Sequence, residues 1–420
     1  MLDIKFIRQN PDKVKEGCQK KHVKVDISLL LKVDKKRREI IQAIEDIRAQ
    51  KNEASRKISQ TKKKQEKQKI ILRMRELDKK QDRMEGILKD ANKKFNRLML
   101  QIPNLPIDGV PVGKDESDNV VIKKAGELTK FNFKPKDHLS IGEKLDLIDT
   151  KRAARVSGAR FGFLKNEAAL LEVALINFGL ESLLKEGFIP IIPPVMIKPE
   201  MMEGMGYVER GREEMYFIEK DNLFLIGTSE QIMGPMHANE IFEEKDLPKR
   251  YVGFSSCFRR EAGSYGKDTK GIFRVHQFDK LEMFIFCHPE KSSQEHKLLL
   301  SIEEKLMKAL KIPYQVVQIC TGDLGDPAAS KYDIEAWIPS QGRYRETHSC
   351  SNCTDFQARR LNIRYRDKDG KLNFIHTLNG TAIATGRTIM AILENYQQKD
   401  GRVLVPGILQ KHLRFKKIGK

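Results

Sequence analysis

Two long segments near the start of the chain place mostly apolar residues at alternating steps of four and three. The first spans residues 33–58 and the second spans residues 77–98, while residues 59–68 between them are polar. This spacing is the heptad pattern of helices that pack along a shared seam. We therefore expect two antiparallel helices of roughly 30 residues, joined at a basic tip, in an arm about 45 Å long. The expected seam consists of Val33, Arg37, Ile40, Ile44, Ile47, Lys51, Ala54 and Ile58 on the first helix, and Leu77, Gln81, Met84, Leu88, Ala91, Phe95 and Leu98 on the second.

A stretch rich in proline and glycine follows the second segment. Residues 103–114 contain three prolines and two glycines, which is typical of a loop or linker. We therefore predict an N-terminal domain over residues 1–105, with a coiled coil over about 30–100, a linker region over residues 106–135 and a second domain over residues 136–420.

The pattern in the second domain is mixed. A long apolar-rich helix is expected over residues 166–185, a strand interrupted by proline over residues 187–196, and further helices over residues 295–310 and 382–396. Several strands have no helix after them, which favours an antiparallel sheet over a doubly wound one. The expected fold class is α+β: an antiparallel β-sheet flanked by helices, with an N-terminal antiparallel coiled-coil arm. The other expected strands lie at residues 119–122, 223–226, 251–254, 280–286, 315–319 and 333–338.

Charge is concentrated in the predicted arm. The 420 residues include 78 Lys and Arg against 58 Asp and Glu, a net charge of +20. Residues 31–100 hold 23 basic and 11 acidic residues, so this segment carries +12 of that excess. Such a surplus indicates a polyanionic partner, with nucleic acid as the first candidate. The alternative is the ordinary solvated face of a dimerising coiled coil.

Several classes of protein do not fit the sequence. The chain has no run of 18 apolar residues, so we expect no membrane span and no membrane partner. Its start lacks the charged and apolar regions of a secretory signal, and Asp3 argues against a transit peptide. Six scattered cysteines do not form a disulfide framework, so a reducing, cytoplasmic location is expected.

The common nucleotide-binding signatures are absent from the sequence. There is no GxxxxGK[ST] loop, no GxGxxG after a strand and no GxSxG elbow, so any nucleotide phosphates must be held by side chains. Residues 254–284 read as a strand ending near Arg259 and Glu261, a charged loop and a returning strand. Residues 378–398 lead through small residues into an apolar helix with Arg387 near its start. Either arginine could bind phosphate. The alternatives are a surface hairpin with solvated ion pairs and a plain buried helix.

In this order, three motifs resemble the signatures of the class II aminoacyl-tRNA synthetases. They are Gly187-Phe188 with Pro193, Phe258-Arg259-x-Glu261, and Gly386-Arg387-Thr388; the class I marks HIGH and KMSKS are absent. The chain is most similar to the seryl-tRNA synthetases, which also carry an N-terminal helical hairpin. The stretches that support this similarity are Gly227-Thr-Ser-Glu230, Val275-His-Gln-Phe278, the stretch from Arg345 to Cys353, Asp355 to Arg360, and Leu393 to Gln397.

The resemblance implies a ligase that activates L-serine with ATP and Mg²⁺ and transfers it to tRNA(Ser) and, where it exists, tRNA(Sec). It also implies a homodimer whose N-terminal domain binds tRNA. By similarity, Arg259, Arg387 and Glu346 serve catalysis, with Glu346 and Ser349 holding Mg²⁺ through ATP. The implied serine-binding residues are Thr228, Ser229, Glu230, Arg259, Glu282, Asn379 and Thr381. The implied ATP-binding residues are Arg259, Arg260, Glu261, Phe273, Val275, Glu346, Thr347, His348, Ser349 and Arg387.

Some positions depart from the commonest family pattern. Thr-Ser-Glu at 228–230, Glu-Thr-His-Ser at 346–349 and Asn-Gly-Thr-Ala at 379–382 are the departures, and the backbone or a hydroxyl group can serve at each. His348, Cys350 and Cys353 suggest a metal site, but no fourth ligand lies at fitting spacing, so no zinc is expected.

Three other functions are alternatives to a seryl-tRNA synthetase. A synthetase for threonine or proline should carry a C-terminal anticodon-binding domain, whereas this chain ends soon after Tyr396. A paralogue that only binds should have lost a phosphate-binding arginine, and both arginines are present. A purely structural coiled-coil protein does not account for residues 187–398.

Overall fold

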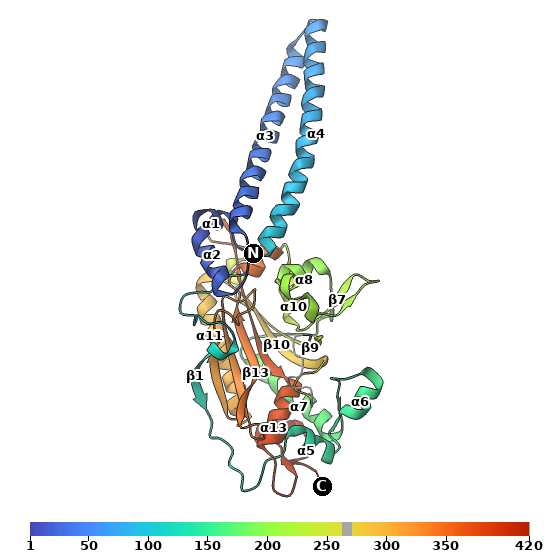
Figure 1. The fold of residues 1–420 in the computed structure, drawn as a ribbon, viewed down its shortest axis with the longest axis vertical. Coiled ribbons are helices and arrows are strands. Elements are labelled where there is room, and N and C mark those ends of the chain that lie inside the picture. The colour runs from blue at the N-terminus through green and yellow to red at the C-terminus, as the bar shows by residue number, and fades with distance from the viewer. Residues whose placement is uncertain (263–270, 420) are drawn as a thin grey trace. The chain divides into compact units, whose positions relative to one another are not determined.

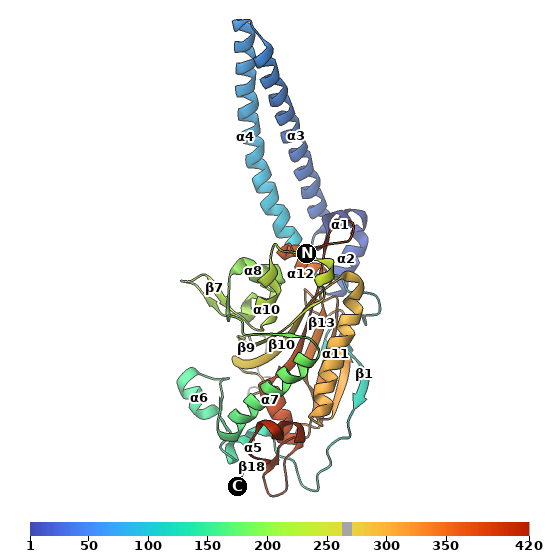
Figure 2. The ribbon, with the colours of Figure 1, turned by 180° about the vertical axis from the view of Figure 1, so that it is seen from behind.

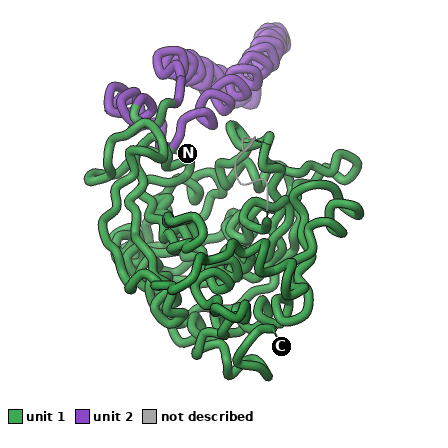
Figure 3. Tube along the Cα trace, turned by 60° about the horizontal axis from the view of Figure 1, so that its bottom comes forward, with its two compact units in different colours: residues 1, 20–22, 104–420 green, residues 2–19, 23–103 purple. Residues whose placement is uncertain are grey.

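The computed structural model describes residues 1–262 and 271–419. Within this range the chain forms two compact units, coloured separately in Figure 3. One unit contains residues 2–19 and 23–103, and the other contains residues 1, 20–22 and 104–420.

The smaller unit is helical and contains the predicted hairpin. α3 and α4 lie side by side along their length (Figure 1). Every expected seam position is buried or half-buried, with Ile40, Ile44, Ile47, Ala54 and Phe95 among the buried ones. The heptad prediction is therefore confirmed. The helices of this unit are α1 (Ile4–Gln9), α2 (Pro11–Lys20), α3 (Ile27–Gln60) and α4 (Lys64–Leu100).

Polar residues in the seam form hydrogen bonds from one helix to the other. Arg37 Nε donates to Asn92 Oδ1 at 2.8 Å, and Lys51 Nζ donates to Gln81 Oε1 at 3.0 Å. The Arg37 guanidinium also lies 4.6 Å from the Phe95 ring centroid. A polar group at a seam position favours one pairing register, because other registers leave it without its partner.

The helices are longer than predicted. α3 has 34 residues and α4 has 37, so the tip is only the three residues 61–63 rather than the polar stretch 59–68. The hydroxyl group of Thr61 donates to the Lys57 carbonyl and ends α3. Polar residues are compatible with a solvent-exposed helix, so their lack of a seam did not mark a loop.

The larger unit is built on an eight-stranded sheet in the order β1-β11-β12-β13-β16-β10-β9-β4. Every neighbouring pair is antiparallel except β4 with β9, which confirms the predicted antiparallel class. β1 lies within the region expected to be a linker. The strands are β1 (Val120–Ala125), β4 (Ile189–Ile191), β9 (Lys249–Phe258), β10 (Gln277–Cys287), β11 (Tyr314–Gln318), β12 (Ser330–Ile338), β13 (Arg343–Asn352) and β16 (His376–Ala384).

Two long helices cover one face of this sheet (Figure 2). They are α7 (Asn166–Lys185), as predicted, and α11 (Ser292–Ala309). α7 approaches the sheet closely at Gly179, where an added Cβ atom would lie 2.6 Å from a Leu281 methyl group. Glycine is needed there because no larger side chain fits between helix and strand.

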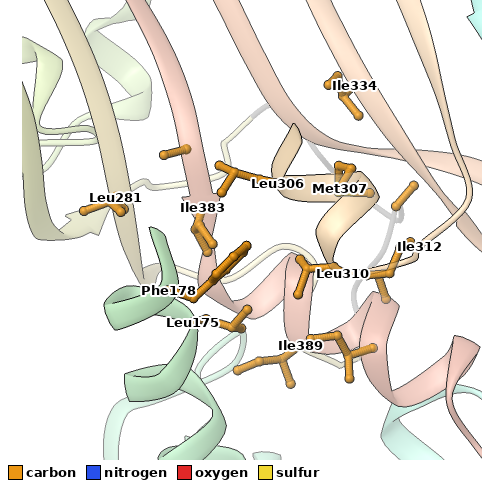
Figure 4. Close-up of a cluster of buried hydrophobic side chains, with 14 of the residues drawn as sticks. Leu175, Phe178, Leu281, Leu306, Met307, Leu310, Ile312, Ile334, Ile383 and Ile389 are labelled. Atoms are coloured by element: carbon orange, nitrogen blue, oxygen red, sulfur yellow. The ribbon is translucent and has the colours of Figure 1, made fainter. Parts of the chain in front are cut away.

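The core lies between these helices and the sheet, and Figure 4 shows part of it. Full burial of each large apolar side chain contributes about 1.5–3 kcal/mol. The layer therefore holds the strands that carry the site in a fixed arrangement. Labelled members are Leu175, Phe178, Leu281, Leu306, Met307, Leu310, Ile312, Ile334, Ile383 and Ile389.

Two element boundaries were predicted wrongly. The helix expected over residues 382–396 begins only at Thr385 as α13 (Thr385–Asn395), because residues 382–384 finish strand β16. The strand expected over residues 187–196 is split into β4 and the first residue of β5 (Met196–Ile197), since Pro193 and Pro194 interrupt it. Pro190 is tolerated because β4 is at the sheet edge.

Short elements complete the larger unit. Two small sheets have two strands each: β2 (Ile148–Asp149) with β3 (Phe163–Leu164), and β17 (Val403–Leu404) with β18 (Lys417–Ile418). A three-stranded sheet has the order β5 (Met196–Ile197), β7 (Leu223–Leu225), β6 (Phe217–Ile218). Another has the order β15 (Leu372–Phe374), β14 (Arg364–Arg366), β8 (Ile241–Glu243). The remaining α-helices are α5 (His138–Lys144), α6 (Thr150–Ser157), α8 (Pro199–Met205), α9 (Val208–Gly211), α10 (Glu230–Met233) and α12 (Phe356–Leu361).

Two further properties concern the whole described chain. All six cysteines are buried thiols that take part in no disulfide bond. Among the described helices, none is long and apolar enough to cross a membrane.

Candidate active site

The predicted site residues come from neighbouring strands of the large sheet and from the segments next to them. Arg259 directly follows β9, Glu282 lies on β10, and Thr381 lies on β16. Glu346 lies on β13, which is hydrogen-bonded to β16. Arg387 is in the first turn of α13. Thr228 and Ser229 immediately precede α10, which begins at Glu230.

Two β-bulges interrupt the register beside these residues. On β16, Ile383 pairs with Leu281 and Thr381 pairs with Glu282, so Ala382 is the extra residue. On β13, Thr347 is likewise extra, between Glu346 and His348. A bulge turns the side chains on one side of it relative to those on the other side. The first bulge places Thr381 opposite Glu282, and the Thr381 hydroxyl donates to Glu282 Oε2 at 3.2 Å.

A buried carboxylate pair forms one part of the site. Glu230 and Glu282 are 5% and 1% exposed, and each has a polar partner. Lys280 Nζ lies 2.6 Å from Glu282 Oε2, and the Tyr207 hydroxyl donates to Glu230 Oε1. Thr228 and Thr381 are also buried. The pocket therefore offers acceptors for a small cationic or hydroxyl-bearing ligand.

The ionisation of Glu230 is sensitive to its surroundings. Burial, together with the nearby Glu282 carboxylate, raises the pKa of Glu230 to about 7. Lys280, the Tyr207 hydroxyl and Arg259 oppose this effect. An ammonium ion bound here would act in the same direction as Lys280, because a nearby cation favours the carboxylate form.

Arg387 and Glu346 form the second part of the site. Arg387 Nη1 lies 3.3 Å from Glu346 Oε1 and donates to the Glu346 carbonyl oxygen at 3.1 Å. Burial alone would raise the pKa of Glu346, but Arg387, Lys331 and Arg259 together hold it at about 2. Glu346 is therefore ionised at neutral pH. Arg259 acts electrostatically on both Glu230 and Glu346, so it connects the two parts.

The Phe273 ring lies against two guanidinium groups. Arg345 Cζ is 3.9 Å and Arg387 Cζ is 4.6 Å from the ring centroid. A planar nucleobase could replace one guanidinium on the ring, because a base and a guanidinium both stack on aromatic faces. Val275 is buried in the nearby core.

Four of the predicted residues point their side chains into the protein. The Thr347 hydroxyl donates to the Ile334 carbonyl, and His348 Nδ1 lies 2.8 Å from Thr347 Oγ1. Burial lowers the pKa of His348 to about 4, so its ring is neutral at pH 7. The Ser229 hydroxyl donates to the Gly253 carbonyl, and Asn379 Nδ2 lies 3.8 Å from Cys353 Sγ. Any contact of Thr347 or His348 with a nucleotide would come from the backbone.

Three others lie at the margin of the site. Glu261 has a left-handed backbone, with φ of 52°, and its carboxylate pairs with Arg274 at 3.3 Å. The Arg260 side chain is exposed, while its backbone N–H donates to the Glu214 carbonyl. The Ser349 hydroxyl donates a hydrogen bond to the Asp333 carboxylate. Burial raises the pKa of Asp333 to about 7.

Sequence reasoning missed Lys280, Tyr207 and Arg345. Lys280 precedes Glu282 by two residues on a strand, so strand periodicity alone places both on one face. Arg345 directly precedes Glu346 in the sequence, but only its stacking on the Phe273 ring shows that it belongs to the site. Tyr207 lies between α8 and α9, far from the motifs in sequence, and no local pattern marked it.

His348, Cys350 and Cys353 do not form a metal site in the structure. In the described part of the chain, no group of three His, Cys, Asp or Glu side chains is arranged to hold a metal ion. Cys350 and Cys353 are buried thiols, and burial raises the pKa of both.

Comparisons with known proteins agree with this arrangement. Residues 1–106 match the family described as Seryl-tRNA synthetase N-terminal domain, and residues 215–396 match the tRNA synthetase class II core domain (G, H, P, S and T). The Serine--tRNA ligase of Dictyoglomus turgidum is 45% identical over 422 residues, covering 100% of this chain and 99% of that protein.

Solved structures give the same result. Seryl-tRNA synthetase from Pyrococcus horikoshii complexed with ATP has a TM-score of 0.93 at 44% identity, covering 100% of this chain and 99% of that one. The cytoplasmic Serine-tRNA ligase of Naegleria fowleri in complex with AMP has a TM-score of 0.87 at 34% identity, covering 100% and 98%.

The antiparallel sheet, the arginines beside it and the matched core domain define a class II aminoacyl-tRNA synthetase, which is a ligase. Within that class, the full-length similarity and the matched N-terminal domain identify the family by the amino acid that its members use. The chain belongs to the seryl-tRNA synthetase family. The threonine, proline and purely structural alternatives are therefore set aside.

Proposed function

We propose that this chain activates L-serine with ATP, releasing diphosphate, and transfers serine from the adenylate to the 3′ end of tRNA(Ser) and, where it exists, tRNA(Sec). One observation carries the proposal: Arg259 interacts electrostatically with both the buried carboxylate pair and the Arg387–Glu346 pair. Serine in the first part and ATP in the second would bring the serine carboxylate to the α-phosphate beside this arginine.

In the proposed mechanism, the protein aligns reactants and stabilises charge. The serine carboxylate is already a nucleophile at neutral pH, so the first step needs no general base. Arg259 would bind the α-phosphate and the serine carboxylate, and Arg387 would bind the γ-phosphate end. Fixed cations at these points lower the barrier because they oppose charge that develops in the transition state.

Serine recognition would use the buried polar groups. The ammonium and hydroxyl groups of serine would bind to Glu230, Glu282, Thr228 and Thr381. The buried residues Ser229 and Asn379 would support this site from the protein interior. Adenine would stack on Phe273 beside Val275, with Glu261 accepting from its amine. Arg260, Thr347 and His348 would line the nucleotide, the latter two through their backbone.

Magnesium fits the donors near Arg387. Glu346 is an ionised carboxylate and Ser349 is a hydroxyl on the same strand, and oxygen donors of this kind suit Mg²⁺. Glu346 and Ser349 would hold Mg²⁺, which would neutralise phosphate charge. No zinc is proposed.

We expect the exchange of diphosphate into ATP to depend on serine. Alanine should support about 10⁴-fold less exchange, because it leaves buried polar groups without a partner. Threonine should be rejected by the size of the pocket. The measurement is radiolabelled diphosphate exchange with each amino acid in parallel. No exchange with serine would overturn the proposed activity.

We also propose the following organisation: residues 1–105 as a tRNA-binding domain, 106–135 as a linker region, and 136–420 as the catalytic domain. The buried cysteines, which form no disulfide bond, suit a reducing cytoplasm. A homodimer would cover apolar side chains that α7 leaves exposed: Leu170 and Val173 are 53% and 54% exposed on one face of that helix.

Replacing both residues, Leu170→Asp with Val173→Asp, is expected to give a monomer, because four carboxylates would face each other in the dimer. Sedimentation velocity should then show a 48.4 kDa species instead of one twice as heavy. Lys185→Asp, on the same helix and exposed, is the control and should remain dimeric. An unchanged sedimentation coefficient in the double variant would place the dimer contact elsewhere.

A further inference from the structure

Lys280 forms a buried ion pair with the proposed serine-binding residue Glu282, but it has no role of its own in the function proposed above. Both side chains project from the same face of β10, two residues apart, and they are 7% and 2% exposed. Their charged atoms lie 2.6 Å apart. Burying two charges is costly unless they are paired and hydrogen-bonded, so such a pair in a ligand pocket calls for an explanation.

The contacts of Glu282 are uneven between its two oxygens. Lys280 and the Thr381 hydroxyl both bind Oε2. Among the residues that the structure describes, no hydrogen-bond donor reaches Oε1. The carboxylate is therefore fixed by one oxygen and presents the other as an acceptor.

Glu230 is held differently. Among the described residues, the only hydrogen-bond partner of its carboxylate is the neutral hydroxyl of Tyr207. The negative charge of Glu282 is matched by a lysine in contact, whereas that of Glu230 is not. A cationic ligand group is attracted more strongly to the unmatched charge, and a neutral hydroxyl can donate to either carboxylate.

We propose that Lys280 is a positioning residue that neutralises and orients Glu282, so that Glu282 Oε1 accepts the side-chain hydroxyl of serine and Glu230 takes the ammonium group. The pair Lys280–Glu282 thereby sets the discrimination of serine from alanine. This inference rests on the serine site proposed above and assigns separate roles to its two carboxylates.

The division of roles has a consequence for pH dependence. Lys280 lowers the pKa of Glu230, so loss of its charge should move that pKa above about 7. Serine binding needs Glu230 ionised, and the rise of kcat/KM with pH should therefore move to higher pH. The groups that face Glu230 are Glu282 and Lys280 on β10, Arg259 after β9, Tyr207 between α8 and α9, and Cys353 after β13.

The test compares Lys280→Met with Lys280→Arg in the full-length enzyme. Serine- and alanine-dependent diphosphate exchange are measured between about pH 6 and 9. In Lys280→Met, we expect the serine-to-alanine ratio of kcat/KM to fall about 10²-fold and the acidic limb for serine to shift upward. Lys280→Arg should retain part of the serine-to-alanine discrimination and part of the normal pH profile, because it keeps the charge. Lys305→Met removes an equally short but exposed ion pair, with Glu186, and should change neither.

The outcomes separate this inference from the function on which it rests. Exchange by the unsubstituted enzyme without any dependence on serine would refute the function itself. Normal exchange, with a Lys280→Met variant that loses activity equally for serine and alanine at an unchanged pH profile, would overturn the inference alone. If Lys280→Met does not fold, Lys280→Gln, which keeps a polar donor without charge, should show the same loss of discrimination and the same shift.

Discussion

Replacing Arg259 with alanine is expected to reduce serine-dependent diphosphate exchange by at least about 10³-fold, which corresponds to about 4 kcal/mol of transition-state stabilisation. Arg259 is the group whose charge acts on both Glu230 and Glu346, and its Nε is oriented by the Gly227 carbonyl at 3.2 Å. Its loss would remove the cation at the point where the serine carboxylate meets the α-phosphate. Exchange kinetics at saturating ATP and serine measure the effect.

Two comparisons make this result specific. Arg259→Lys keeps the charge but not the planar fork, so it should recover only part of the activity. Arg402→Ala removes an arginine that pairs with Asp400 at the surface and should behave as the unsubstituted enzyme. Thermal unfolding of each variant tests for folding. A folded Arg259→Ala enzyme with near-normal exchange would show that the two parts of the site do not act through this residue.

Deleting residues 36–98 is expected to separate activation from charging. This segment contains 21 basic and 10 acidic residues and is held by its own seam. Its removal should leave diphosphate exchange within about twofold of normal, since the residues proposed for activation all lie in the larger unit. Charging of tRNA(Ser) should fall by about 10³-fold at moderate salt, because the loss of phosphate contacts weakens binding.

A charge variant supplies the control for this deletion. Changing Lys62, Lys63, Lys64, Lys67 and Lys69 to glutamine keeps both helices but removes positive charge near the tip. If the arm binds phosphate, this variant should raise KM for tRNA and reduce the salt dependence of charging. Equal loss of exchange and charging in the deletion would contradict a role of the arm in tRNA binding.

The arm was the part of the fold most accessible to sequence reasoning. Its seam repeats every seven residues over long helices, so each apolar residue reports the same interface, and Arg37, Lys51 and Gln81 fit because they find partners across it. The tip was placed poorly, since solvated helical residues and a solvated loop have similar composition. α1 and α2 are too short for a period to be visible in them.

The site was predictable where strand periodicity and motif order specify it, and not where tertiary contacts do. The residues on β10, β13 and β16 were expected from the motifs, but the bulges at Ala382 and Thr347 depend on pairing between distant strands. The error over residues 382–384 has the same cause: the apolar sequence Ala-Ile-Ala is compatible with both helix and strand, and sheet pairing decided between them. Tyr207 reaches Glu230 only through the folded chain.

Because all six thiols are buried, a dye can be attached selectively to the arm to measure its motion. Because Cys18, Cys257, Cys287, Cys320, Cys350 and Cys353 are all buried, maleimide dyes should react slowly with the folded protein. A single cysteine introduced at an exposed tip position such as Lys63 would then be the preferred site of attachment. Fluorescence anisotropy from that one dye could follow the arm as tRNA arrives and leaves, without first removing any native cysteine.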